Sequence, residues 1–487
     1  MMKNIKIVFG LALASLVFSC EDATDIRQPG VLDAATAIQS LDDMEDALIN
    51  AYTGMFVTAE MHFTSVFTDE IRIGFDSGGQ GQSLYRFNLA SNNAGPSNVW
   101  RNNYSSIRRT NLVIEAAATV DATGDEARRD NILGQAHAIR AWQHLQLASL
   151  YIVDMSDDTS LGIPVVDFVT GTGYTALRNT TGDTFDFIYD DLDTAVSLIS
   201  ANSGSIFFSK DAARALKARA AAYREDYTTA APIAQTLATS YPLAGTTAYE
   251  NVFRDTDNSE VIMKLERTIN DAFDGQGNTG DSSNGGWAGA KYAFTGPDIA
   301  GSPYYEVATA LYNAFDANDV RRGVNAAAFE PWPAAGRNVY TVNKYRGSQG
   351  RPLMNDHKIL RSSEMVLILA EARAQANDPA GAAGFVDQIR DARYGADQAT
   401  PSYGSQTEAW GGILDERRLE FAFEGHRYKD LRRMGSKGNR TVDRDTGDCT
   451  PFGACTIAIN DDRFTWPLPL VEFNGNPALR AQQNPGY

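Results

Sequence analysis

Three glutamates near the C-terminus, Glu416, Glu420 and Glu424, repeat at four-residue spacing, and a pair of carboxyl groups is what a glycoside hydrolase uses. Such an enzyme needs one carboxyl group whose pKa is raised and which has no cationic partner. Arg417 and Arg427 stand among and beside these glutamates, so the pattern favours ionised carboxylates on one helical face. Ion-pair networks of this kind often imitate active sites. We therefore expect structural glutamates, no catalytic residues and a protein that is not an enzyme.

Other sequence motifs for cofactor binding, metal binding or catalysis are incomplete. Residues 275–280 read Gly-x-Gly-x-x-Gly, but no apolar strand precedes them and no helix follows, which argues against a dinucleotide site. The oxygen-rich segments 255–260 and 443–448 lack the glycine that a calcium loop carries at its sixth position. The five histidines form no His-Glu-x-x-His motif, and no Gly-x-Ser-x-Gly turn occurs. The sequence therefore predicts no cofactor and no bound metal.

The N-terminus carries the pattern of a lipid anchor. Lys3 and Lys6 precede an apolar run, 7–18, and Cys20 follows soon after its end. The run is shorter than the roughly 20 residues that span a bilayer. This order is similar to the bacterial lipobox, in which the cysteine is acylated and becomes the first residue. An ordinary signal peptide with an incidental cysteine is the alternative.

The lipobox interpretation divides the N-terminal region into two parts. It predicts a lipoprotein signal peptide over residues 1–19 and a lipidated tether over residues 20–34, with the lipid on Cys20. Glu21 and Asp22 resemble the surface-export signal of Bacteroidetes lipoproteins. We therefore expect a protein anchored by its N-terminal lipid to the outer membrane, on the cell surface.

Charge limits the possible ligands. The formal net charge is −18, and a field of that sign repels phosphate backbones, so we expect no nucleic-acid partner. Acidic glycans are disfavoured too, unless a local basic patch overrides the mean. Neutral ligands are unaffected.

Two cysteines remain once Cys20 carries lipid. Cys449 and Cys455 lie in a loop rich in glycine and proline, and an even count in an oxidising compartment favours a disulfide. A metal site would need further ligands nearby, and the closest histidine in the sequence is His426. We expect the disulfide.

Helical periodicity dominates the remaining chain. Apolar residues recur at three- and four-residue spacing over 41–51 and 132–151. Small alanines, a short polar break and a following proline within 211–240 resemble a tetratricopeptide unit of about 34 residues. The expected elements are helices over 41–51, 132–151 and 185–198, and helix pairs over 211–223 with 227–237 and over 365–375 with 380–390. We expect an all-α fold in which tetratricopeptide-like pairs form a scaffold, with generic antiparallel helices as the alternative.

Two long segments interrupt this scaffold. Residues 74–96 and 271–303 are rich in Gly, Asn and Ser, yet they carry several aromatic residues. Irregular segments longer than about 15 residues are usually functional or disordered, and aromatics argue against disorder. We therefore expect irregular loops that carry a ligand-binding face.

Several motifs, in order along the chain, resemble those of one family. Trp100, Tyr104, Ile107 and Asn111 match a Trp…Tyr…Ile…Asn helix of the SusD/RagB-like surface lipoproteins, and here we expect a helix that begins at Trp100. A second match covers residues 134–142, where Gln135 and His137 depart from the family's usual Glu and Arg.

The C-terminal matches are more specific. Residues 361–372 resemble the family's Arg-Tyr-Ala-Glu…Ala-Glu-Ala motif, with Ser362 in place of the tyrosine. Residues 416–433 match Glu-Arg…Glu…Glu-Gly-x-Arg-x-x-Asp-Leu-x-Arg closely. Trp-Pro-Leu-Pro at 466–469 and the terminal Asn-Pro-Gly-Tyr resemble the family's ending.

The resemblance implies an N-terminal helical region over 35–255 and a RagB/SusD C-terminal region over 256–487, together forming one body. It implies capture of an oligosaccharide or polysaccharide without chemistry, and delivery to a SusC-like TonB-dependent outer-membrane transporter. Peptide capture, as in RagB-like members, remains an alternative. A secreted glycoside hydrolase on a helical scaffold is a weaker one.

The ligand site is expected where aromatic rings occur in loops. Sugar rings stack on indole or phenol, and their hydroxyl groups need amide or carboxylate partners. The predicted platform consists of Trp287 and Trp100, with Tyr85, Phe75, Tyr292 and Tyr304 as weaker candidates and Asn103 as a hydrogen-bonding residue beside it. Tyr104 is expected in the core. Exposed clusters of such rings mark binding patches.

Overall fold

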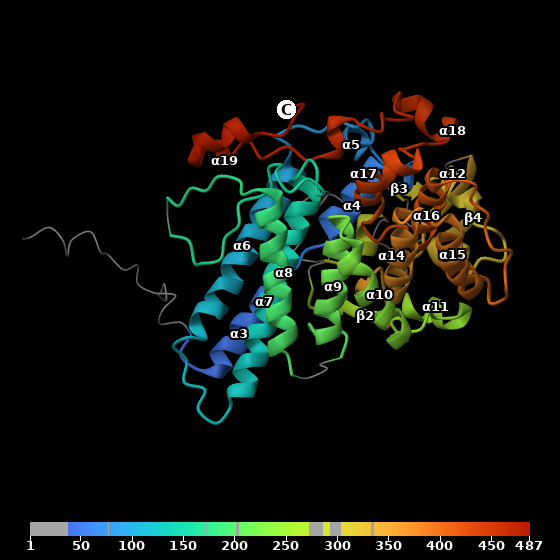
Figure 1. Cartoon of the computed structure of the whole chain (residues 1–487). Coiled ribbons are helices and arrows are strands. Elements are labelled where there is room, and N and C mark those ends of the chain that lie inside the picture. The colour runs from blue at the N-terminus through green and yellow to red at the C-terminus, as the bar shows by residue number, and fades with distance from the viewer. Residues whose placement is uncertain are drawn as a thin grey trace, which may run out of the picture.

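The computed structural model of the chain describes residues 38–75, 77–171, 173–200, 204–271, 286–292, 303–332 and 336–487. The predicted signal peptide, Cys20 and the tether lie outside the described residues. Helices make up most of the described chain, and several long ones stand side by side (Figure 1). In the described segments no helix is both long and apolar enough to cross a membrane.

The N-terminal half is a series of helices joined by short turns and two longer loops. Its helices are α3 (Leu41–Tyr52), α4 (Thr58–Phe67), α5 (Gln82–Tyr85), α6 (Ala94–Ala116), α7 (Glu126–Tyr151), α8 (Thr181–Leu198), α9 (Lys210–Tyr223), α10 (Tyr227–Ser240) and α11 (Thr246–Val252). Polar residues fix several starts: Ser40 and Asp43 form a capping box at α3, and Thr180 and Asp183 form another at α8. Helices α6, α7, α8 and α9 contact one another in chain order.

The C-terminal half combines helices with short strands. Its α-helices are α12 (Thr309–Ala314), α13 (Val320–Asn325), α14 (Ser362–Gln375), α15 (Pro379–Tyr394), α16 (Gln406–Glu420), α17 (Arg427–Gly438), α18 (Thr446–Cys449) and α19 (Glu472–Gly475). Short 3-10 helices are η1 (Ala288–Lys291), η2 (Thr450–Phe452), η3 (Asp462–Phe464) and η4 (Pro477–Gln482).

Within the described residues, three small antiparallel sheets accompany the helices. The strands are β1 (Ile71–Ile73), β2 (Val261–Leu265), β3 (Tyr305–Val307), β4 (Ala326–Trp332), β5 (Arg337–Val342), β6 (Gly347–Ser348), β7 (Arg351–Pro352) and β8 (His357–Arg361). Their order is β1-β3-β5-β4 in the largest sheet, β2-β8 in the second and β6-β7 in the third. The expected helical scaffold is confirmed, and these sheets are an addition that helical periodicity did not predict.

The helix pairs of the scaffold form where the sequence predicts them. Helices α9 and α10 pack together, α14 and α15 pack together, and α10 contacts α14, so the two pairs stack. Buried alanines such as Ala215 and Ala218 let α9 lie close to its neighbours. Pro379 begins α15 and Gly395, at φ +67°, ends it, which is the usual asymmetry of helix ends. Tetratricopeptide-like pairing therefore describes this part of the fold.

Two local expectations are wrong. Helix α6 begins at Ala94, so Trp100 lies in its second turn and not at its start. Helix α16 ends at Glu420, so Glu424 is not on the same helical face as Glu416 and Glu420. The chain reverses beyond α16 through Phe423 and Gly425, both at positive φ, and a continuing helix cannot accommodate that conformation.

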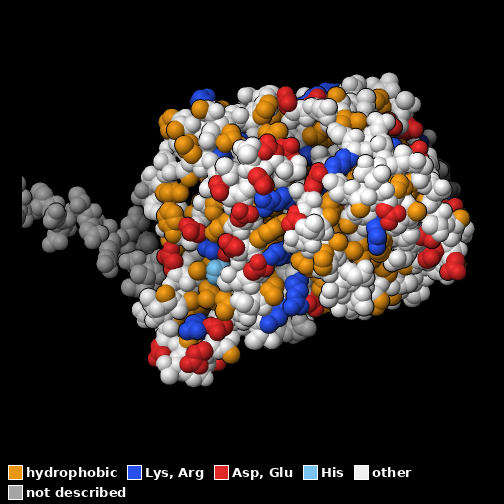
Figure 2. Space-filling model, viewed as in Figure 1, with side chains coloured by type: hydrophobic (Ala, Val, Ile, Leu, Met, Phe, Trp, Pro, Cys, Tyr) orange, Lys and Arg blue, Asp and Glu red, His pale blue; other side chains and the backbone are white. Residues whose placement is uncertain are grey.

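One hydrophobic core runs through both halves, from Leu41 in α3 to Leu479 in η4. Cys449 and Cys455 form a disulfide with a Cα–Cα distance of 4.9 Å, as the sequence predicts. On the face drawn in Figure 2, acidic and basic side chains are interspersed, with no large area of one sign.

Candidate functional site

The glutamates that could suggest catalysis are buried and paired with cations. Glu420 contacts Arg361 and Arg393, each at 2.8 Å. Glu416 contacts Arg321 at 2.7 Å. Burial alone would raise the pKa of Glu420, but the charges of Arg393 and Arg361 hold that pKa well below its usual range. Both carboxylates therefore hold the fold together, and Glu420 lacks the raised pKa of an acid catalyst.

Glu424 joins the same network from outside the helix. It lies 2.9 Å from Arg361 and 2.6 Å from Lys344, whose side chain is fully buried. Arg361 thus contacts Glu260 of the β2 region, Glu420 and Glu424 together. The network joins β8, the residue that precedes β2, and the segment that follows α16.

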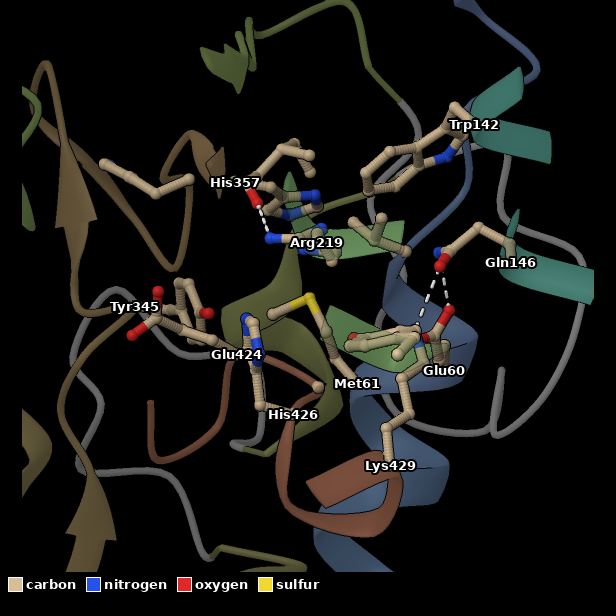
Figure 3. Close-up of a pocket in the computed structure, with 15 residues that line it drawn as sticks. Glu60, Met61, Trp142, Gln146, Arg219, Tyr345, His357, Glu424, His426 and Lys429 are labelled. Atoms are coloured by element: carbon tan, nitrogen blue, oxygen red, sulfur yellow. Dashed lines mark hydrogen bonds and ion pairs between the residues drawn. The ribbon is translucent and has the colours of Figure 1, made fainter. Parts of the chain in front are cut away.

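An internal cavity beside this network is lined by charged residues but is small. Figure 3 shows Glu60, Gln146 and Lys429 at one side of it, with Glu424 and His426 nearby. Glu60 is paired with Lys429 and accepts a hydrogen bond from the Gln146 amide at 2.7 Å. The cavity volume of about 30 Å³ is of the order of one or two waters. A sugar ring does not fit there.

Most rings of the predicted aromatic platform are buried, which corrects the expectation that they form one exposed surface. Tyr85 has no exposed surface, because the guanidinium of Arg444 lies 3.7 Å from its ring centre. Tyr292 stacks near Tyr345, and its hydroxyl lies 3.0 Å from the Ser65 hydroxyl. Tyr304 is also buried. Contacts from distant parts of the chain cover these rings, and loop composition does not reveal such contacts.

Two of the predicted rings are half-buried. The Trp287 indole N–H donates to the Thr268 carbonyl at 3.2 Å, and the side chain packs on Ala290 and Leu353. The backbone N–H of Phe75 donates to Glu306 at 3.1 Å. Neither residue lines the cleft described below. Their contact with a ligand stays a prediction.

Trp100 and Asn103 occupy neighbouring turns of α6. Trp100 is 3% exposed and packs on Tyr104 and Tyr151, with 4.9 Å between ring centres in each pair. The Asn103 amide donates to the Val99 carbonyl at 2.7 Å, within the same helix. Tyr104, expected in the core, is half-buried and donates its hydroxyl hydrogen bond to the Pro164 carbonyl at 2.8 Å. Of the predicted platform, only Trp100 lines this cleft.

The cleft lies between three segments that are distant in the sequence. One wall is α6, the second is the loop 164–176 between α7 and α8, and the third is the region of α19 and η4. Its volume is about 510 Å³, within the range of roughly 300–1,000 Å³ that is typical of small-molecule sites. The Asn476 amide donates to the Ala176 carbonyl at 2.5 Å, which ties the third wall to the second.

Exposed apolar side chains cluster around this cleft. Large exposed hydrophobic residues of its walls and flanks are Phe168, Tyr174, Leu177, Leu470 and Val471. Tyr174 is 44% exposed and meets Phe168 edge to face, with 5.2 Å between ring centres. Apolar side chains gather at the corresponding end of the face in Figure 2. A concentration of this kind is typical of a binding site.

Polar groups complete the cleft. Arg101 and Arg108 are exposed on α6, two turns apart, and both line it. Glu472 is half-buried, and burial raises the pKa of its carboxyl although the Trp100 indole donates a hydrogen bond to it. The cleft therefore combines aromatic surface with hydrogen-bond donors and an acceptor, which suits a polyhydroxylated ligand better than a purely apolar one.

Sequence reasoning missed Tyr174, Phe168, Arg101, Arg108 and Glu472. One signal was available: residues 152–180 form a long connection between two helices and carry two aromatic residues, as the two selected loops do. No sequence signal brings α19 next to α6, because the contact joins segments more than 300 residues apart.

Comparisons with known proteins agree with one another. A model of the SusD family matches residues 311–487, and a model described as starch-binding associating with outer membrane matches residues 25–221. The two matches do not overlap, and together they cover more than half of the chain. SusD-like protein P2 of Formosa agariphila is 25% identical, with 100% of each chain covered.

Solved structures show the same fold. A SusD superfamily protein from Bacteroides vulgatus ATCC 8482 superimposes with a TM-score of 0.76 at 23% identity, over 92% of this chain and 99% of the other. A laminarin-binding SusD-like protein gives a TM-score of 0.69 at 20% identity, over 92% of this chain and 100% of the other. The two family models, the full-length relative and the fold all indicate the same family. The chain therefore belongs to the SusD/RagB-like family.

Proposed function

We propose that this protein captures an oligosaccharide or polysaccharide in the cleft between α6, the loop 164–176 and α19. The observation that carries the proposal is the cleft itself: about 510 Å³, with Trp100, Tyr104 and Tyr174 beside exposed arginines and Glu472. The family description and the laminarin-binding neighbour support a carbohydrate as the ligand.

Binding would combine stacking of sugar rings on aromatic side chains with hydrogen bonds to polar groups. The exposed ring of Tyr174 offers a face for a sugar ring, whereas Trp100 is almost fully buried and its indole N–H lowers the pKa of the Glu472 carboxyl. Arg101 and Arg108 can donate to sugar oxygens, and Glu472 can accept from a hydroxyl group. No step of this binding requires a catalytic acid, and we propose that the protein is not an enzyme.

The finer role follows from the N-terminal sequence and the family. We propose lipidation at Cys20, display on the outer-membrane surface, and delivery of the captured sugar to a SusC-like TonB-dependent transporter. Replacing Cys20 with Ala is expected to release the protein from membranes or to stall its processing. Unchanged partitioning into detergent would contradict the anchor. Co-purification with a TonB-dependent barrel in mild detergent tests the partner.

The binding role is tested by gel retardation against a panel of neutral and acidic polysaccharides, followed by an assay for new reducing ends. We expect retardation by at least one polysaccharide and no increase in reducing ends. Release of reducing ends would instead support the hydrolase, and retention of peptides with no glycan binding would support peptide capture.

A further inference from the structure

A second groove lies away from the aromatic cleft, where the last helix of the N-terminal half meets the C-terminal half. It runs between α11, the α12–α13 region and the segment 343–346, and has a volume of about 740 Å³. Three arginines line it: Arg254, Arg322 and Arg346. Within the described part of the chain, none of the three forms an ion pair with a carboxylate.

The arginines of the buried network differ from these three. Arg321, next to Arg322 in the sequence, contacts Asp319, Glu416 and Glu420 and is 1% exposed in its side chain. Arg361 and Arg393 are likewise neutralised by glutamates. These three buried arginines are therefore paired with carboxylates, whereas the three that line the groove are not.

The acidic residues of the groove leave a positive balance. Of its two carboxylates, Asp319 is already bound by Arg321, with an Nη2–Oδ2 distance of 2.8 Å. Glu250 alone remains to balance three guanidinium groups, and its side chain is exposed. Burial lowers the pKa of Arg254, and the nearby charge of Arg346 lowers it further, although Glu250 and Asp255 act in the opposite sense. An anion between the arginines would relieve this repulsion.

The groove is poorly suited to sugar stacking. The Tyr312 ring is stacked on Tyr340, with 3.7 Å between ring centres and an interplanar angle of 20°. The guanidinium of Arg322 lies 4.7 Å from the Tyr312 ring centre and donates to its hydroxyl at 3.0 Å. The ring therefore holds Arg322 in place, and charge is the feature that this groove presents to a ligand.

We propose that this groove is a second glycan-binding site, selective for carboxylate or sulfate groups carried on sugars. The inference rests on the proposed function, since it takes the ligand to be a glycan, and it adds a preference for acidic chains. Guanidinium groups recognise both oxyanions with paired N–H donors. The net charge of −18 repels polyanions in general, so an acidic chain would bind at a locally basic groove rather than over the whole surface.

The probes are a galacturonate tetramer, the same tetramer fully methyl-esterified, a sulfated galactan tetrasaccharide and neutral laminarihexaose. Isothermal titration of the full mature chain is expected to show binding of one or both acidic probes and at least tenfold weaker binding of the esterified tetramer. The carboxylated and the sulfated probe distinguish the two sources of the anion. Raising the salt concentration from 50 to 500 mM is expected to weaken the acidic interaction.

Two variants test the groove. Arg346→Gln removes an exposed side chain, so folding is not at risk, and Arg254→Gln removes a half-buried one. Each is expected to weaken acidic binding about tenfold, whereas Arg86→Gln, an exposed arginine outside the groove, leaves it unchanged. Equal binding of charged and esterified tetramers, full affinity in both groove variants, or no binding of either acidic probe would overturn the proposal.

Laminarihexaose separates this inference from the proposed function. If the neutral probe binds and Tyr174→Ala weakens it while the groove variants do not, the aromatic cleft stands, whatever the acidic probes show. If acidic binding depends on Arg346 while no neutral sugar binds, the acidic-glycan site in the groove is supported and the proposed carbohydrate site in the cleft is contradicted.

Discussion

The buried charges around α16 and the open cleft beside α6 differ in how their side chains are used. In the first region, Glu420 contacts three arginines and no solvent, so its charge holds several elements together. In the second, Tyr174 is 44% exposed and Arg101 faces solvent, so rings and cations are left available. Carboxylates at helical spacing are therefore structural here, whereas the proposed binding surface consists of side chains that are largely free of internal contacts.

The largest expected effect is on the buried network. Glu420→Ala leaves Arg361 and Arg393 buried without that partner, and breaking such a pair costs about 3–5 kcal/mol of unfolding free energy. Urea unfolding followed by circular dichroism measures the change.

The matched control lies on the same helix. Asp415 contacts Arg440 at 2.8 Å, but their side chains are 50% and 41% exposed. Asp415→Ala is expected to cost about 0–1 kcal/mol, as exposed ion pairs do. Similar losses in the two variants would show that burial does not decide the importance of these pairs.

Glu70 is a buried glutamate without the arginine shell that surrounds Glu420. Burial raises the pKa of its carboxyl to about 7, although it accepts hydrogen bonds from Ser65 at 2.8 Å and from the Phe423 N–H at 3.1 Å. A folded-state pKa above the ordinary value means that the native state holds its proton more tightly than the unfolded state. The contribution to stability is therefore full below about pH 4.5 and is lost as pH rises through 7.

Replacing Glu70 with Gln removes this titration. The stability of the variant relative to the unmodified protein is expected to rise by roughly 2–3 kcal/mol between pH 5 and pH 8, since one pKa unit corresponds to about 1.4 kcal/mol. Urea unfolding of both proteins at each pH measures the difference. A difference that does not change with pH would mean that Glu70 is ionised in the folded protein throughout this range.

The two regions also differ in how far the sequence predicts them. Local patterns predicted the helix pairs, because small alanines such as those of α9 and the polar break after them act within a few residues. The family motif at 416–433 and its interleaved arginines indicated paired carboxylates, and the structure contains such pairs. Only the place of Glu424 was wrong, because the reversal at Phe423 and Gly425 was not recognised.

The cleft could not be predicted in the same way. Its walls come from α6, the loop 164–176 and α19, and loop composition says nothing about which segments meet. Composition also failed for Tyr85, because Arg444, more than 350 residues away, covers its ring while donating to the Phe67 and Tyr85 carbonyls. Exposure depends on such long-range contacts, so aromatic residues in glycine-rich loops are an unreliable guide to a binding surface.

The most direct test of the central claim is titration calorimetry of the cleft with a neutral glucan oligosaccharide derived from a polysaccharide that retards the protein in the gel. Tyr174→Ala is expected to weaken binding about tenfold, since loss of one stacked ring removes about 1.4 kcal/mol, with no change in melting temperature. The control, Ile49→Ala, removes a side chain that is 46% exposed on α3, outside the cleft, and is expected to bind normally. Equal affinity in Tyr174→Ala and the unmodified protein would contradict the assignment of the cleft as the carbohydrate site.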